Sequence, residues 1–312
     1  MNANKLTSRI ITGLMIGVVV SVLFFFWGDV REVKDVIFSI SVPTYLLAIA
    51  TTLASYFVRF LKWQYFLKVL KIEVPWKDSL NIHFIGLSMS ITPGKVGELL
   101  KSYLLKNRAG VEMARSAPAV FADRLTDLFA MLCLVGAGVS LFAYGTLAFL
   151  IVLAGLLAIT VILQSRSISL WLIDRLAKIS FFQKRKDSLL TLYESTYELL
   201  RFKALSFATL LSVIAWFMEC ISLYVLIVNL GLDLSLLHVV FIFSLGTVAG
   251  ALSMLPGGLG IAEGSMTGMF LYFGLAKGTA VSITLLIRLV TLWLGVLIGI
   301  FIFFLKRKTY MP

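Results

Sequence analysis

The chain has 312 residues, of which 60% are hydrophobic and only 14% are charged. A soluble domain is about half apolar and about a quarter charged, so this composition excludes an ordinary soluble protein and indicates an integral membrane protein. The formal net charge is +12, but the basic residues gather at the ends of apolar segments, which favours membrane topology over a nucleic-acid-binding surface. Both cysteines lie inside apolar stretches, so we expect no disulfide framework, no metal site and no cofactor.

Six segments are long enough to cross a bilayer as helices, because a crossing takes about 20 residues. In chain order they are residues 10–27, 43–61, 117–142, 144–163, 204–230 and 278–305. Two further apolar stretches, 79–105 and 236–273, are each interrupted near the middle by Pro-Gly. Segment 10–27 lacks a small-residue cleavage pattern, so we expect it to be a retained first span. The connection 164–203 mixes apolar and basic residues and predicts amphipathic helices on the membrane surface, with a basic solvated loop as the alternative.

Lysine and arginine residues in the connections predict the orientation of the spans. One side would carry Lys5, Arg9, Lys62, Lys68, Lys71, Lys77, Arg108, Arg115, the connection 164–203 and Lys306. The other side would carry only Arg31, Lys34 and Lys277. We therefore expect a multi-pass protein of the cell membrane with both termini in the cytoplasm. On this count each Pro-Gly stretch enters and leaves on the same side, which predicts two re-entrant hairpins. The alternative is that each stretch is a pair of tilted helices that cross fully.

The two hairpins resemble each other in sequence. Residues 90–97 (SITPGKVG) align with residues 253–260 (SMLPGGLG) at an offset of 163, and Arg124 aligns with Arg288 at an offset of 164. A glutamate, Glu98 or Glu263, follows each motif. The sequence thus predicts an all-α membrane bundle made of two halves, 1–143 and 144–312, which the charge pattern places in opposite orientations. Inverted repeats with broken helices that meet near mid-membrane are a recurring plan of transporters.

The broken segments are candidate binding elements, because irregular backbone inside a membrane is tolerated only when it is buried in protein or faces water. Proline removes a backbone donor, and glycine permits a sharp turn. A half-helix N-terminus at each break would favour an anion such as phosphate, with Lys95 adding a full positive charge. The alternative is that Pro-Gly only allows tight turning and close helix packing. The residues assigned to these breaks are Pro93, Gly94, Lys95, Gly97, Pro256, Gly257, Gly258 and Gly260.

Two arginines inside apolar segments also need an explanation, because a charge at membrane depth is costly. Arg59 lies near the end of segment 43–61, where it either belongs to the site or reaches along its aliphatic stem to the membrane surface. Arg288 lies too deep in segment 278–305 for that. We expect it to bind Glu263, Glu219 or an anionic ligand.

A group of charges opens segment 117–142. Asp123 and Asp127 are spaced to share one helix face, and Arg124 can reach Asp127 three residues on. This group either lines the binding site or forms a purely structural ion pair. Glu98 either binds a cation of the site or caps its own half-helix.

These motifs carry a family resemblance. Segments 92–98 (TPGKVGE), 123–127 (DRLTD) and 255–263 (LPGGLGIAE) resemble the lysylphosphatidylglycerol synthase transmembrane region, also called the flippase-like or UPF0104 family, and the resemblance covers nearly the whole chain. In the multiple-peptide-resistance-factor proteins, the comparable region is associated with moving aminoacylated phosphatidylglycerol between leaflets. Their lysine transfer from charged tRNA belongs to a separate cytoplasmic domain that we do not expect here. The resemblance therefore implies no enzymatic activity, and other relatives link the family to prenyl-phosphate sugar metabolism.

The sequence thus predicts a lipid flippase or transporter for an anionic phospholipid or a prenyl-phosphate lipid. Lys95, Arg124 and Arg288 would bind the phosphate, while Glu98, Asp123, Asp127 and Glu263 would hold these cations. The alternatives are a membrane subunit or enzyme of lipid modification, and a transporter of small solutes or ions. We expect no nucleic-acid partner and leave self-association open.

Overall fold

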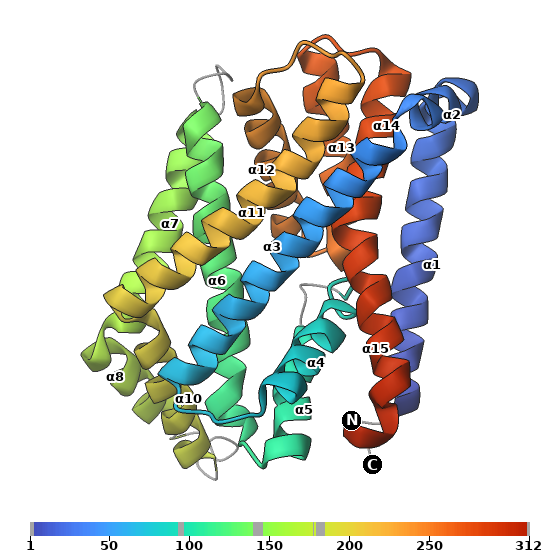
Figure 1. The fold of residues 1–312 in the computed structure, drawn as a ribbon. Helices are drawn as coiled ribbons and strands as arrows, with labels where there is room; N and C mark the ends of the chain where they lie inside the picture. The colour runs from blue at the N-terminus through green and yellow to red at the C-terminus, as the bar shows by residue number, and fades with distance from the viewer. Residues whose placement is uncertain (1–2, 93–96, 140–145, 177, 179–184, 311–312) are drawn as a thin grey trace.

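The computed structural model describes residues 3–92, 97–139, 146–176, 178 and 185–310, and every regular element within these ranges is a helix. The predicted all-α membrane bundle is thereby confirmed. Most helices run between the two ends of an elongated molecule (Figure 1). We call the end where α1 (Ala3–Trp27) starts and α15 (Leu294–Tyr310) finishes the terminal end, and the opposite end the distal end.

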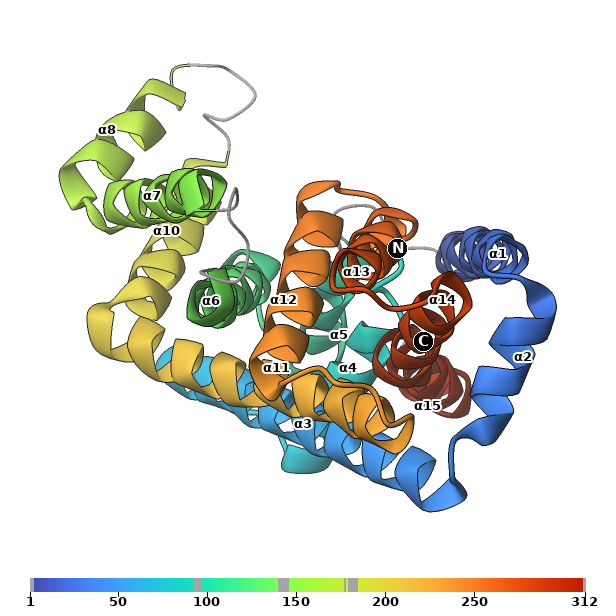
Figure 2. The same ribbon diagram turned by 90° about the horizontal axis from the view of Figure 1, so that it is seen from above.

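The first part of the chain rises, crosses the distal end and returns. α1 bends by 100° into α2 (Val30–Ser39), which lies across the distal end (Figure 2). α3 (Val42–Val69) descends to the terminal end, where α4 (Trp76–Leu87) and α5 (Leu100–Ala109) form the first hairpin. α6 (Met113–Gly138) then climbs back to the distal end.

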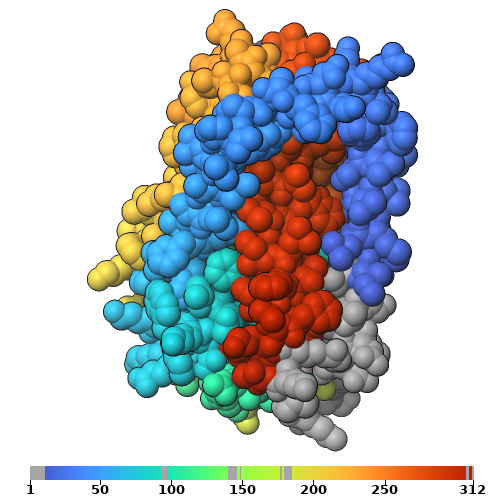
Figure 3. Space-filling view, turned by 45° about the vertical axis from the view of Figure 1, so that its right-hand side comes forward, coloured from blue at the N-terminus to red at the C-terminus, as the bar shows by residue number. Residues whose placement is uncertain are grey.

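The second part begins with α7 (Thr146–Gln164), which bends by 76° into α8 (Arg166–Leu176) at the terminal end. α10 (Lys186–Leu200) leads into α11 (Phe202–Asn229), which runs antiparallel to α3. The second hairpin consists of α12 (Leu236–Leu252), a 3₁₀ turn (Pro256–Gly258) and α13 (Ile261–Tyr272). The last span joins α14 (Lys277–Arg288), a π-helical turn (Leu289–Trp293) and α15. Figure 3 shows this span as a column between α3 and α1.

The spans agree with the prediction in place but not in every boundary. Within the described ranges, α3, α11 and residues 277–306 are long and apolar enough to cross a membrane, and each bent pair, α1–α2 and α7–α8, adds one candidate. The predicted span 117–142 corresponds to α6, a helix of 26 residues whose apolar character is interrupted by Asp123, Arg124 and Asp127. α3 continues past the predicted end of the second span at 61 and ends at Val69. Lys62, which we placed in the following connection, lies within this helix and is fully buried in protein.

The course of both hairpins fits the predicted re-entrant arrangement. α4 has 12 residues and α5 has 10, while α12 has 17 and α13 has 12. A 12-residue helix is about 18 Å long, well short of the roughly 30 Å hydrocarbon core. The first hairpin enters from the terminal end and the second from the distal end, and both turn back inside the bundle (Figure 1). Their tips meet there, since a Cβ built on Gly257 would lie 3.5 Å from Cγ2 of Ile91.

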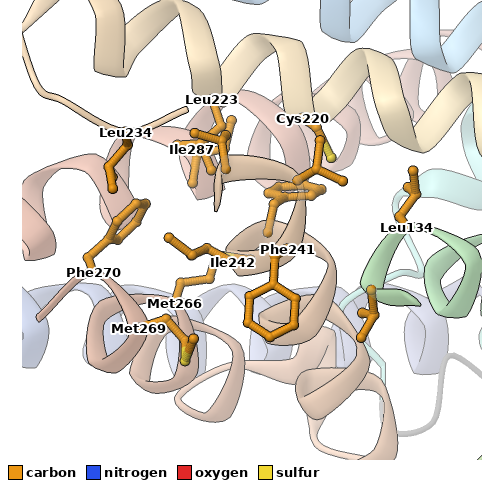
Figure 4. Close-up of a cluster of buried hydrophobic side chains, with 14 of the residues drawn as sticks. Leu134, Cys220, Leu223, Leu234, Phe241, Ile242, Met266, Met269, Phe270 and Ile287 are labelled. Carbon is orange, nitrogen blue, oxygen red and sulfur yellow. The ribbon is translucent and has the colours of Figure 1, made fainter. Parts of the chain in front are cut away.

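The second hairpin sits in an apolar core. Phe241 and Ile242 of α12 and Met266 of α13 pack with Leu223 of α11 and Ile287 of α14 (Figure 4). Close van der Waals contact holds these helices together, because lipid tails are as apolar as the side chains and give the helices no hydrophobic drive to associate.

In its described residues, the predicted surface connection contains two different helices, α8 and α10. α8 exposes Ile168, Trp171 and Leu172, whose spacing puts them on one face. α10 instead buries Tyr193 and Leu199 against the bundle. The surface interpretation thus fits α8, whereas α10 is part of the packed protein.

Candidate functional site

Eight charged side chains from α3, α5 and its entry, α6 and α11 meet beside the first hairpin. Salt bridges join them into one set, which we call the ion network. Its members are the cations Arg59, Lys62, Lys101 and Arg124 and the carboxylates Glu98, Asp123, Asp127 and Glu219. Four positive and four negative charges balance, which buried charges require if their desolvation is to be offset.

Lys62 lies at the centre of this network. Its Nζ is 2.8 Å from Asp123 Oδ1 and 2.6 Å from Asp127 Oδ1. It also donates to the Ser212 hydroxyl of α11 at 2.7 Å. Helix α3 therefore places one fully buried ammonium where it joins α6 to α11.

Arg59 lies one turn earlier on the same face of α3. Its Nη2 donates to Glu219 Oε1 at 2.8 Å, and its Nη1 is 3.4 Å from Asp127 Oδ2. The guanidinium also lies 3.9 Å from the ring centre of Trp216, a cation–π contact. The side chain is 9% exposed, so it points into the bundle and does not reach for the membrane surface.

Arg124 is the accessible member of the network. Its guanidinium bridges Asp123 at 2.7 Å, Glu98 at 3.2 Å and Asp127 at 3.2 Å. Its side chain is 30% exposed, whereas each of the other seven is at most 9% exposed. The predicted Arg124–Asp127 contact is thus present, but as part of a larger set.

Glu98 lies at the entry to α5. It is 3.8 Å from Lys101 and accepts a hydrogen bond from Ser90. Among the described residues it pairs with cations, and no side chain caps the start of α5. Lys101 in turn reaches Asp123 at 3.2 Å and lies 4.7 Å from the ring centre of Trp63.

A second, smaller charge pair braces the tip of the second hairpin. Arg288 donates through Nε to Glu263 Oε1 at 2.6 Å and through Nη2 to the Gly257 carbonyl at 2.6 Å. Of the two acidic partners that we expected for Arg288, Glu263 is the one that it binds. The other oxygen of Glu263 accepts the Gly260 N–H at 2.7 Å, so this carboxylate caps the N-terminus of α13. The anion position that the sequence predicted at this half-helix is occupied here by the chain's own carboxylate.

The glycines of this tip have the backbone conformations that the Pro-Gly motif implies. Pro256 opens the 3₁₀ turn, and Gly257, Gly258 and Gly260 have φ of +62°, +67° and +85°. Gly258 also packs against α12: a Cβ there would lie 2.9 Å from the Gly250 Cα. The turn therefore needs glycine both for its conformation and for close approach.

The corresponding tip of the first hairpin is described only in part. Pro93, Gly94 and Lys95 lie outside the described residues. Gly97 donates its N–H to the Thr92 hydroxyl at 2.9 Å, which closes the described part of the turn.

Sequence reasoning missed Lys62 and Lys101 as members of the network and named Glu219 only as a partner of Arg288. It also missed the Ser212 hydroxyl that Lys62 binds. A signal for both lysines was present, because Lys62 follows Arg59 by three residues and Lys101 follows Glu98 by three, a spacing that puts each pair on one helix face. We assigned Lys62 to a connection because it followed an apolar run. Ser212 gave no signal, since its contact with Lys62 depends on how α3 crosses α11.

A π-helical turn lies between the two charged groups. It directly follows Arg288, and its Thr291 carbonyl accepts a hydrogen bond from the Tyr56 hydroxyl of α3 at 2.7 Å. Tyr56 is one turn before Arg59. Turns of this type are frequent at functional sites, and this one links the helix of Arg288 to the helix of the ion network.

A hollow of about 550 Å³ opens at the end of α3 and the start of the next loop. Its lining includes Gln64, Lys68, Lys71 and Glu73. It lies towards the terminal end, and no member of the ion network lines it, so we assign it no part in the site.

Comparison with known proteins agrees with this architecture. A family model described as the lysylphosphatidylglycerol synthase TM region matches residues 14–299. The chain is similar to a UPF0104 membrane protein of Pyrococcus horikoshii, with 27% identity over 95% of this chain and 96% of that protein. A UPF0104 membrane protein of Methanothermobacter thermautotrophicus is 29% identical over 78% of this chain and 77% of its own length. The broken hairpins, the charged sixth helix and this end-to-end match identify the chain as a member of the lysylphosphatidylglycerol synthase transmembrane-region family.

Proposed function

We propose that the protein is a lipid transporter of the cell membrane that moves an anionic phospholipid or a prenyl-phosphate lipid between leaflets. The observation that carries this proposal is Arg124, a partly exposed side chain whose guanidinium already holds three carboxylates beside the hairpin. The proposal assigns no chemical reaction to the chain.

A phosphate headgroup would bind by exchange. A guanidinium offers five N–H donors in a flat fork that fits the oxygens of phosphate as well as those of carboxylate. A phosphate arriving at Arg124 would take the place of Glu98 or Asp127, and the displaced carboxylate would keep a second cation, Lys101 or Arg59. No buried charge would then lose its last partner.

The arrangement of the hairpins supports movement across the membrane. They enter from opposite ends and meet at their tips, the plan in which alternating access exposes one site to each side in turn. Arg288 would join the site when Glu263 leaves it, because Glu263 now occupies both the guanidinium and the adjacent helix N-terminus.

A leaflet-exchange assay tests this proposal. Protein reconstituted in liposomes with fluorescent phosphatidylglycerol should make the inner-leaflet label accessible to dithionite. Losing a charge-assisted contact costs about 1.5–3 kcal/mol, so Arg124→Ala should slow exchange roughly ten- to a hundredfold. The matched control is Arg108→Ala, which removes a 44% exposed arginine that pairs with Asp78 and should keep the wild-type rate.

The exchange rate of the Arg124→Ala variant is interpreted only after its folding has been checked. Arg124→Ala must elute from gel filtration and melt as the wild type does for its rate to be compared. A folded Arg124→Ala variant with the wild-type rate would contradict the assigned role. A wild-type protein that moves neither labelled phosphatidylglycerol nor a labelled prenyl phosphate would contradict lipid transport itself.

A further inference from the structure

Helices α3 and α11 match each other in length and in the way they end. Each has 28 residues, and every position of α3 corresponds to α11 at an offset of 160. Both end in the same hydrogen-bonded cap: Ile72 N–H donates to Leu67 O at 2.9 Å, and Leu232 N–H donates to Ile227 O at 3.3 Å. The offset grows from 160 to 163 at the Pro-Gly motifs because α12 is five residues longer than α4, while the link from the helix to the proline is two residues shorter (253–255 against 88–92).

The contacts between α3 and α11 are reciprocal under this offset. The counterpart of Lys62 is Ser222, and the counterpart of Thr52 is Ser212. Lys62 binds Ser212 at 2.7 Å, and Thr52 and Ser222 share a hydrogen bond of 3.0 Å. A contact that recurs with its partners exchanged is the mark of a two-fold axis.

The centre of the crossing is marked by an ion pair between counterparts. Arg59 and Glu219 are 160 positions apart and bind each other at 2.8 Å. A residue meets its own counterpart only near the axis, so this pair lies close to it. Apolar packing has the same pattern: Phe66 packs in one cluster with Ala208, and Ala48 packs in another with Leu226.

The packing of the two hairpins against the other helices is also reciprocal. α4 of the first hairpin packs closely on α15, where a Cβ on Gly299 would lie 2.5 Å from the Phe84 carbonyl. α12 of the second hairpin packs on α6, where a Cβ on Gly138 would lie 2.6 Å from the Phe241 Cβ. Each entering helix is thus held by the last span of the other half.

We propose that the crossing of α3 and α11, centred on Arg59 and Glu219, is the fixed pivot of the protein, and that the two hairpin tips move relative to it. The inference rests on the proposed transport and locates its motion. When two symmetry-related halves exchange conformations, a contact between counterparts maps onto itself and is kept. The crossing is also tied there by buried, directional hydrogen bonds that are costly to break. The tips meet through Ile91, Gly257 and Leu292, whose apolar contacts have no preferred direction.

Disulfide trapping separates the pivot from the tips. In a background without Cys133 and Cys220, Thr52→Cys with Ser222→Cys crosslinks the crossing, where the native hydroxyls are 3.0 Å apart. Ile91→Cys with Leu292→Cys, joined by a short bifunctional thiol reagent, ties the first tip to the π-helical turn. Leu292 is preferred to Gly257 because φ of +62° at Gly257 would strain a cysteine.

The two crosslinks should act oppositely in the leaflet-exchange assay. The pivot crosslink should leave the rate within about twofold of the reduced form, and the tip crosslink should lower it at least about tenfold. A pivot crosslink that stops exchange reversibly, or a tip crosslink that leaves it unchanged, would overturn the pivot.

Distances between spin labels test the pivot without a measurement of lipid movement. Spin labels on the exposed Leu46 of α3 and Leu210 of α11 should give one narrow distance distribution in liposomes. Labels on Leu46 and the exposed Leu255, next to the second tip, should give a broad or two-peaked distribution. A broad distribution for the first pair would refute the pivot, whereas absence of lipid exchange in the wild type would refute only the proposed function.

Discussion

Lys62 shows how a single residue can join three membrane helices. It has no exposed surface, and its ammonium is surrounded by Asp123, Asp127 and Ser212. Each of these contacts is short, so the cost of burying the charge is offset by directional bonds. The residue is a structural cation of the network, while Arg124 is its accessible one.

Replacing Lys62 by methionine should therefore destabilise the protein strongly. The shape of the side chain is nearly kept, but Asp123 and Asp127 lose their closest common cation, a change worth about 3–5 kcal/mol for a buried pair. Unfolding by sodium dodecyl sulfate in mixed micelles measures the loss. Lys68→Met, at an exposed position in the last turns of the same helix, is the control and should change stability by less than about 0.5 kcal/mol. Equal losses of stability in the two variants would contradict the structural role assigned to Lys62.

The structure of the second hairpin depends on the turn that joins α12 to α13. Arg288 and Glu263 clamp the Gly257 carbonyl and the Gly260 N–H at the same time. The turn is thus held by two backbone groups and two charged side chains. A hairpin of 17-residue and 12-residue helices would otherwise have few directional constraints at its tip.

Three glycine-to-alanine substitutions in this hairpin should change the stability of the protein by different amounts. Gly258→Ala combines φ of +67° with a Cβ only 2.9 Å from the α12 backbone, so it should cost most, about 3 kcal/mol or more. Gly260→Ala, at φ of +85° with open space around it, should cost about 1–2 kcal/mol. Gly268→Ala lies in ordinary helix with open space and should stabilise by up to about 1 kcal/mol. Mixed-micelle unfolding midpoints should follow this order, and a different order would refute the close-approach argument.

For the whole molecule, hydropathy and charge predicted the course of the chain because both depend on local sequence. A span needs a long apolar run, and the bias of basic residues correctly put the two chain ends together at one end of the bundle (Figure 1). The same rule failed at Lys62, since a lysine after an apolar run is indistinguishable in sequence from a lysine at a membrane surface. The Arg124–Asp127 contact followed from spacing within one helix. Glu219 and Lys101 joined the network only through packing between distant segments, which spacing does not encode.

The orientation of the bundle in the membrane remains a prediction, and cysteine labelling tests it. In a cysteine-free background, single cysteines at the exposed Arg31 and Asp233 should react with an impermeant maleimide in intact cells, because both lie at the distal end. Cysteines at the exposed Lys77 and Lys306, at the terminal end, should react only after permeabilisation. Labelling of Lys77→Cys and Asp233→Cys from the same side would contradict the entry of the two hairpins from opposite sides, whichever side faced outward.

The charge balance of the ion network has a consequence for energetics. A membrane potential of 100 mV does about 2.3 kcal/mol of work on each net charge that crosses it. The eight charges of the network sum to zero, so a voltage does almost no net work when they shift together. The network therefore gives the rate of lipid exchange almost no dependence on the membrane potential. Any voltage dependence of exchange should report the charge of the cargo and not that of the network.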